Sequence, residues 1–128
     1  MTRNMLKSKI HRARVTGVHL DYEGSVTIDK DLLKEADILP YEQVNVLNVN
    51  TGARFTTYAI EGKSGVGQIE LNGAAARLAA KGDIVIILTY TTLPEEEAES
   101  FMPRMVYVNA ENKIVSSKRA IGTLELGE

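Results

Sequence analysis

The chain has 128 residues, a formal net charge of -2 and 44% hydrophobic residues, which suits one globular domain with a modest core. The small net charge argues against binding of polyanions by bulk charge. The absence of cysteine excludes disulfide scaffolds, cysteine-based zinc sites and thiol nucleophiles. No apolar h-region follows the basic N-terminus, and the longest aliphatic run, residues 84–88, is too short to span a bilayer. We therefore expect a cytoplasmic protein with no membrane partner.

The first third of the chain predicts strands and one helix. Residues 1–14 are rich in lysine and arginine, and an extended strand there is expected to resume through residues 15–22, where apolar and β-branched residues recur. A short strand at residues 26–28 follows. Asp29 then has the character of an N-cap before a helix with apolar residues at helical spacing, and Pro40 ends that element.

The middle of the chain is again dominated by predicted strands. They are expected at residues 43–49 and 54–60, separated by a turn, while residues 61–67 hold three glycines and predict a loop. A turn then opens a short alanine-rich helix that is expected to end near Lys81-Gly82. Residues 83–91 form the most apolar stretch, which predicts a central strand.

The last part of the chain predicts one helix start and one hairpin. Residues 94–97 place Pro94 at the first helical position, with acidic residues in the first turn. Residues 105–108 and 114–116 resemble the two arms of a hairpin, and residues 117–128 lack periodicity and are expected to fray. Many short strands with two or three small helices predict a mainly β fold, in the form of a compact barrel.

The Gly24-Ser25 step carries a chemical signal as well as a structural one. Gly24 has no Cβ, so its carbonyl carbon is uncrowded and the Ser25 hydroxyl can attack it, shifting the linkage from amide to ester. Loss of the Ser25 Cα proton would then eliminate the ester and leave dehydroalanine, which hydrolyses to a pyruvoyl ketone. A bare Gly-Ser pair is more often a turn, so the flanking residues decide between the two interpretations.

Four motifs resemble one known family in order and spacing. They are Met5-Leu6-Lys7-Ser8-Lys9-Ile10-His11-Arg12-Ala13, Tyr22-Glu23-Gly24-Ser25, Arg54-Phe55-Thr56-Thr57-Tyr58 and Leu71-Asn72-Gly73-Ala74-Ala75-Ala76-Arg77. The chain thereby resembles the pyruvoyl-dependent aspartate 1-decarboxylases, over most of its length and least after about Asn112. The resemblance implies a double-ψ β-barrel and a homotetramer. It also implies conversion of L-aspartate to β-alanine and CO2, in the biosynthesis of pantothenate.

The resemblance also implies self-processing between Gly24 and Ser25. The single domain, residues 1–128, would be cut into a β chain of residues 1–24 and an α chain of residues 25–128 that begins with the pyruvoyl group. That group would be the cofactor, with no metal and no pyridoxal phosphate. Its ketone would form a Schiff base with the aspartate amine and accept the electrons left by the departing carboxylate. Whether a helper protein assists this processing is left open.

Within the resemblance, cationic and hydroxyl side chains receive the chemical roles. Arg54 is expected to hold a substrate carboxylate through its bidentate fork, and Lys9 a second carboxylate as a point charge. Tyr58 is expected to reprotonate the substrate carbon, and Thr57 to hydrogen-bond the oxyanion that develops during self-cleavage. Because Arg54 and Tyr58 share one strand face and Thr57 the other, a bulge or a neighbouring subunit has to bring the three together.

The remaining candidates border the same expected pocket. Asn72 and the backbone of Gly73, Ala74 and Ala75 are expected to present N–H groups to substrate at a helix start, although a mere helix cap is about as good an interpretation. His11 and Tyr22 are expected to support the site. For each, a structural role is an equal alternative.

Two other functions compete with the enzyme. The basic N-terminal segment could make the chain a nucleic-acid-binding β module, although 5% aromatic residues offer few stacking platforms and we expect no nucleic-acid partner. The chain could also be a non-catalytic barrel that acts as an interaction subunit, with Gly24-Ser25 a plain turn. Intact-mass analysis of the chain separates both from the decarboxylase.

Overall fold

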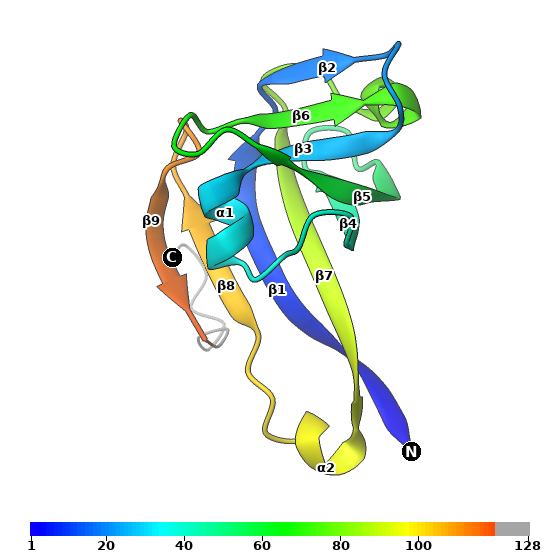
Figure 1. Cartoon of the computed structure of the whole chain (residues 1–128), viewed down its shortest axis with the longest axis vertical. Coiled ribbons are helices and arrows are strands. Elements are labelled where there is room, and N and C mark those ends of the chain that lie inside the picture. Colours follow the sequence, from blue (N-terminus) through cyan, green and yellow to red (C-terminus); the bar gives the residue numbers. More distant parts are fainter. Residues whose placement is uncertain (120–128) are drawn as a thin grey trace.

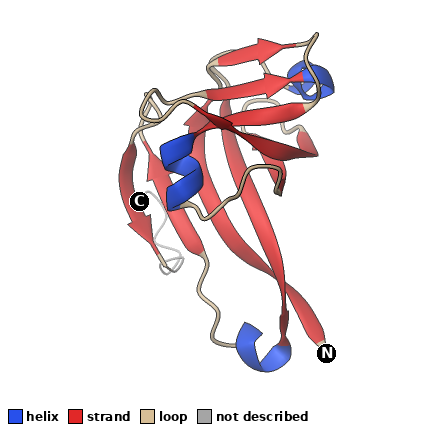
Figure 2. Cartoon of the chain, viewed as in Figure 1, coloured by secondary structure: helices blue, strands red, loops and turns tan. Residues whose placement is uncertain are grey.

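Nine strands form one curved sheet in the computed structural model, which describes residues 1–119 (Figure 1). The strands are β1 (Thr2–Arg14), β2 (Gly17–His19), β3 (Ser25–Asp29), β4 (Gln43–Asn48), β5 (Arg54–Gly62), β6 (Ile69–Asn72), β7 (Ile84–Pro94), β8 (Arg104–Val108) and β9 (Ile114–Lys118). Their order across the sheet is β2-β6-β3-β5-β4-β7-β1-β8-β9. The short helices are α1 (Lys30–Glu35), the 3₁₀-helix η1 (Gly73–Leu78) and α2 (Glu95–Ala98) (Figure 2). The predicted fold class, mainly β with a few short helices, is confirmed, and it is consistent with the expected barrel.

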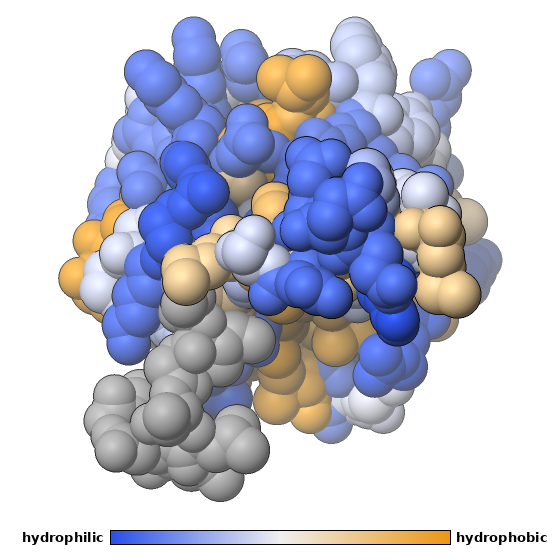
Figure 3. Space-filling view, turned by 90° about the horizontal axis from the view of Figure 1, so that it is seen from below, coloured by the Kyte–Doolittle hydropathy of each residue, from blue (hydrophilic) through white to orange (hydrophobic). Residues whose placement is uncertain are grey.

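The sheet has two parts that cross each other. β1 and β7 form a long antiparallel pair, and β2, β6, β3 and β5 lie across one end of it (Figure 1). The apolar core fills the inside of this bend, and Ile10, Val26, Val46, Ala59 and Ile87 are all 0% exposed there. The predicted central strand is confirmed, since β7 lies between β4 and β1. In the view from below, the surface is mostly hydrophilic with separate apolar patches (Figure 3).

Buried polar side chains fasten the loops to this framework. The predicted N-cap is confirmed: the Asp31 N–H donates to Asp29 Oδ1 at 2.7 Å, and the Gly67 N–H donates to Asp29 Oδ2 at 2.7 Å. The buried Asn112 donates from its Nδ2 to the carbonyls of Arg14 and Gly67, at 2.8 and 2.7 Å. The loop after β5 is therefore held to both α1 and the end of β1.

Three local predictions need correction or limits. The alanine-rich helix is a 3₁₀-helix that ends at Leu78, because a separate turn follows in which the Asp83 N–H donates to the Ala80 carbonyl. Pro94 is the N-cap of α2 rather than its first helical residue, because its backbone is still extended (ψ 151°) at the end of β7. Residues 117–118 belong to β9, whereas the predicted fraying of residues 120–128 lies outside the described part of the chain.

Among the described residues, no helix has the length and apolarity required to cross a membrane.

Candidate active site

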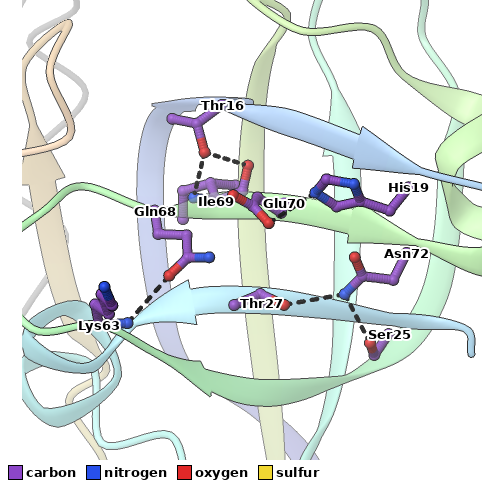
Figure 4. A network of polar contacts seen from close by, with 9 residues as sticks. All are labelled: Thr16, His19, Ser25, Thr27, Lys63, Gln68, Ile69, Glu70 and Asn72. Atoms are coloured by element: carbon purple, nitrogen blue, oxygen red, sulfur yellow. Dashed lines mark hydrogen bonds and ion pairs between the residues drawn. The ribbon is translucent and has the colours of Figure 1, made fainter. Parts of the chain in front are cut away.

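Ser25 begins β3 directly opposite Asn72, the last residue of the antiparallel strand β6. Asn72 Nδ2 donates to Ser25 Oγ at 2.9 Å and to Thr27 Oγ1 at 3.0 Å (Figure 4). Ser25 and Asn72 are only 3% and 4% exposed. The side chain of Asn72 makes no capping hydrogen bond to η1, so its amide serves the buried serine instead of the helix.

The segment that contains the Gly24–Ser25 bond lies directly on Gly73. Gly73 has φ +66°, and a Cβ at this position would lie 2.5 Å from the Gly24 nitrogen and 2.6 Å from the Tyr22 carbonyl oxygen. Glycine is therefore required here both for its backbone conformation and for the close approach of residues 22–24. A Cβ built on Gly24 would have the Asn72 carbonyl oxygen as its nearest neighbour, at 3.9 Å, which is an ordinary van der Waals contact without a clash.

Strand register places Ser25 on the outer face of the sheet, away from the core. Val26 pairs with Leu71 and with Ala59, and all three are 0% exposed in the core. Side chains alternate along a strand, so Ser25 and Asn72 project from the opposite face. β5 runs parallel to β3, and Ala59 of β5 pairs with Val26 of β3. One residue earlier in each strand, Tyr58 lies alongside Ser25. Tyr58 therefore shares the outer face next to Ser25.

Arg54 lies further along the same face of β5, on a hollow of about 210 Å³. The hollow is lined by Asn45, Leu47, Arg54, Phe55, Thr56, Leu88 and Tyr90. Arg54 is exposed, and within residues 1–119 it forms no ion pair. Its guanidinium fork is thus available for a carboxylate ligand.

Thr57 lies on the other face of β5. The pairing of β4 with β5 runs from Gln43 opposite Tyr58 to Leu47 opposite Arg54 without a register shift. Thr57 pairs with Val44, which is 1% exposed, so the threonine faces the core side of the strand. The bulge that could have joined Thr57 to Arg54 and Tyr58 is absent from this strand pair.

Lys9 and His11 lie on β1, at a distance from Ser25. Lys9 pairs with Leu88 of β7, which pairs with Asn45 of β4, which in turn pairs with Thr56 of β5. Arg54 is two residues before Thr56, so Lys9 and Arg54 share the outer face. Four strand spacings separate β1 from β3, which carries Ser25, roughly 19 Å along the sheet. One chain therefore does not bring Lys9 to the serine.

His11 has an unusual environment on β1. Its ring contacts Tyr107 edge-on at 5.6 Å between centroids, and its buried Nδ1 has no hydrogen-bond partner in the described part of the chain. Burial is the main cause that lowers the pKa of His11 below its ordinary value of 6.5, and the positive charges of Lys9 and Arg12 lower it further.

Some neighbours of the serine are not apparent from sequence. Thr27 shares the Asn72 amide with Ser25, and His19 binds Glu70 (Figure 4). The His19 ring also stacks on Tyr22. His19 by itself predicts only a surface residue, and its partner is set by the parallel pairing of β2 with β6, which no local pattern shows. Of the predicted backbone group in η1, Ala75 is buried and Ala74 is exposed.

A comparison with protein families gives a direct match to this arrangement. The model of the family described as aspartate decarboxylase matches residues 1–115, a range that includes every candidate side chain discussed above. The chain belongs to the aspartate decarboxylase family.

Individual relatives support this family membership over nearly the whole chain. The aspartate 1-decarboxylase of Thermoanaerobacter pseudethanolicus is 57% identical over 116 residues, which cover 91% of this chain and 99% of the relative. The aspartate 1-decarboxylase of Dehalococcoides mccartyi is 55% identical over 122 residues, 95% of this chain and 98% of the relative. That of Ralstonia pickettii is 54% identical over 118 residues, 92% and 98% of the two chains. The resemblance found in the four motifs is therefore confirmed.

Proposed function

We propose that this member of the aspartate decarboxylase family converts L-aspartate to β-alanine and CO2 with a pyruvoyl group made from its own Ser25, and that the β-alanine serves pantothenate biosynthesis. Family membership supports the decarboxylation. The observation that carries the pyruvoyl part is the buried Ser25 hydroxyl, which follows an uncrowded glycine and is oriented by Asn72. The family match favours this function over a nucleic-acid-binding module or an inert interaction subunit.

Self-cleavage would proceed at the Gly24–Ser25 bond. Ser25 Oγ bonds to the Gly24 carbonyl carbon as the C–N bond breaks, and the hydroxyl proton passes to the freed nitrogen. The Ser25 Cα proton then leaves, the Cβ–Oγ bond breaks and Gly24 departs as a carboxylate, which divides the chain into residues 1–24 and 25–128. Water finally replaces the nitrogen on Cα, which leaves as ammonia, and a ketone remains.

The residues present fit this sequence of steps. Asn72 holds Ser25 Oγ on the outer face and limits the rotamers of the attacking hydroxyl. The Ser25 hydroxyl lies 3.4 Å from the Glu23 carbonyl oxygen, which is a weak contact and leaves the hydroxyl free to turn towards Gly24. Thr57 is proposed to stabilise the oxyanion. Since its side chain faces the core side of β5, that role requires a rearranged strand or a neighbouring copy.

The substrate would bind across the outer face. When formed, the pyruvoyl group supplies a ketone beside an amide carbonyl, which together take up the electron pair left by CO2. Arg54 and Lys9 would hold the two carboxylates of aspartate, and Tyr58 would donate its phenol proton to the carbon that lost CO2. Asn72 and the backbone of residues 73–75 would border the pocket, with His11 and Tyr22 as supporting residues.

The distance between these groups supports a site shared between copies, as in the homotetramer that the family resemblance implies. Arg54 and Tyr58 lie on the face of Ser25, whereas Lys9 is on β1, several strands away. The hollow at Arg54 is open and has Tyr90, 48% exposed, on its wall. A second copy that covers the hollow would exclude water and bring its own Lys9 to the substrate. A cytoplasmic location and a helper protein for processing stay predictions.

Intact-mass spectrometry of the purified full chain over time tests the proposal. We expect the single mass to be replaced by two fragments broken after Gly24, of which the second resists Edman degradation and reacts with a carbonyl reagent. Appearance of the fragments should parallel release of CO2 and β-alanine from L-aspartate. An active preparation whose chain is uncut and has no ketone would disprove the pyruvoyl mechanism and leave only the family assignment.

A further inference from the structure

The loop of residues 20–24 arches over the end of β6. β6 lies between β2 and β3, and it pairs with β2 in parallel and with β3 antiparallel. His19, at the end of β2, and Ser25, at the start of β3, are both opposite Asn72. The loop therefore leaves and re-enters the sheet on the two sides of one residue, with Gly73 directly beneath it.

The β2 side of this arch is held by a hydrogen bond and a ring stack. His19 Nε2 lies 2.9 Å from Glu70 Oε1, and the two side chains are 39% and 26% exposed (Figure 4). The His19 ring stacks on Tyr22 with centroids 5.2 Å apart and an interplanar angle of 24°. Both side chains lie close to Gly17, since a Cβ there would contact Glu70 and His19 at 3.4 Å.

Few other contacts fix this side of the loop. β2 has only three residues, and the turn after it is closed by a long hydrogen bond of 3.4 Å from the Tyr22 N–H to the His19 carbonyl. Tyr22 itself is 66% exposed, so burial does not hold it. The contacts run from Glu70 through His19 to Tyr22, whose carbonyl rests on Gly73 two residues before the Gly24 carbonyl.

We propose that Glu70 and His19 are positioning residues for self-cleavage, which act through the stack of His19 on Tyr22. This inference rests on the proposed self-cleavage at Gly24–Ser25. Neither residue touches the reacting atoms; in this proposal the pair limits the movement of residues 22–24, so that the Gly24 carbonyl is aligned when the Ser25 hydroxyl turns towards it. An intramolecular attack depends steeply on such alignment, so a looser loop cleaves more slowly although Ser25 and Asn72 are intact.

The test compares conservative and truncating substitutions by the rate at which the full chain is converted to two fragments. Glu70→Ala and Tyr22→Ala should slow cleavage about tenfold or more, because each breaks one link of the chain of contacts. Glu70→Gln, whose amide oxygen still accepts from His19, and Tyr22→Phe, which keeps the stacked ring, should remain within about threefold of the unsubstituted chain. Glu97→Ala, at an exposed position of α2, is the control for loss of a surface carboxylate.

The outcomes separate this inference from the function on which it rests. If the unsubstituted chain does not cleave, the proposed function fails. If it cleaves and the two alanine variants cleave at the same rate, or the conservative variants are as slow as the alanine variants, the positioning role is wrong. Because Tyr22 is exposed, its two variants are expected to fold. They therefore still test the positioning role if Glu70→Ala fails to fold.

Discussion

Two regions of the outer face differ in how complete they are within one chain. Around Ser25, strands β3 and β6 and the loop of residues 20–24 enclose a buried polar cluster in which the hydroxyl already has its donor. Around Arg54, strands β4, β5 and β7 form an open hollow whose cationic side chain has no ion pair in the described residues. The first region already contains the proposed nucleophile and its Asn72 partner, whereas the proposed substrate site in the second still needs a cover and a second cation. Cleavage should therefore respond to small changes in volume, and substrate binding to changes in charge.

Removal of the hydroxyl should have the largest effect and stop both processes. In Ser25→Ala the Gly24 carbonyl has no nucleophile and no ketone can form, so we expect one uncut chain without release of CO2. Intact mass and an assay for CO2 measure the two losses. Ser116→Ala removes an exposed hydroxyl on β9 and should be cut and active. Residual decarboxylation by purified Ser25→Ala would contradict the mechanism.

A single methyl group at Gly73 should disturb the cleavage region next most strongly. Its Cβ would overlap the Gly24 nitrogen and the Tyr22 carbonyl oxygen, and neither backbone can move without displacing the scissile bond. We expect Gly73→Ala to cleave about 100-fold more slowly, the order of loss that a displacement of about 1 Å produces. Fragment formation over time is the measurement.

Gly52 offers a matched control for that substitution. It also has a positive φ, +80°, but a Cβ there would have no neighbour within 4 Å. Gly52→Ala should therefore show only the cost of the left-handed backbone, about 1–2 kcal/mol of stability, and cleave at the normal rate. Equal cleavage by the two variants would mean that the contact between Gly73 and the loop is irrelevant to the reaction.

In the open region, loss of charge should separate substrate turnover from cleavage. Arg54→Ala removes a bidentate partner of a carboxylate, and we expect kcat/KM for aspartate to fall roughly 10- to 100-fold. Cleavage should be close to normal, because Arg54 lies four residues before Tyr58 on β5, away from the loop. Arg3→Ala, which breaks an exposed pair with Glu95, is the control. An equal loss of cleavage and turnover in Arg54→Ala would mean that its role is misassigned.

The contrast between the regions also explains what sequence could predict. The family, the mainly β fold and the Asp29 N-cap depend on local patterns and motifs, and these are confirmed. Alternation along a strand already separated Thr57 from Arg54 and Tyr58, and the regular pairing of β4 with β5 keeps them apart. What a local pattern shows is the face on which a side chain lies.

Neighbours across strands could not be predicted in this way. Asn72 could equally have been a helix cap, and only the register of β3 with β6 directs its amide to Ser25. The pairing of His19 with Glu70 depends on a three-residue parallel contact between segments about fifty residues apart. Such registers are set by packing of the whole sheet, so the roles of Lys9, Tyr58 and Thr57 stay predictions until they are measured.

The smallest expected effect concerns His11, which lies on β1 against Tyr107, outside both regions. Burial and the charges of Lys9 and Arg12 lower its pKa in the folded chain below the ordinary value of 6.5. As pH falls through 6.5, the unfolded chain therefore binds more protons than the folded chain. The free energy of unfolding should decrease over this range until the folded histidine is also protonated. In the uncut Ser25→Ala chain, His11→Gln should weaken this dependence between pH 7.5 and 5.5, measured as the thermal unfolding midpoint.

Asp83 provides the contrast that makes the histidine result interpretable. A hydrogen bond from Asn48 and then one from the Ala80 N–H lower the pKa of Asp83 below 3.8. Its contribution is therefore fully present above pH 3.8 and is lost only as pH falls towards the lowered pKa. Asp83→Asn should shift the unfolding midpoint by the same amount at pH 7.5 and 5.5, whereas His11→Gln should shift it unequally. If His11→Gln, like Asp83→Asn, shifted the midpoint by the same amount at pH 7.5 and pH 5.5, the environment of His11 on β1 would differ in solution. A second copy that covers His11 and supplies a partner for Nδ1 would be one cause.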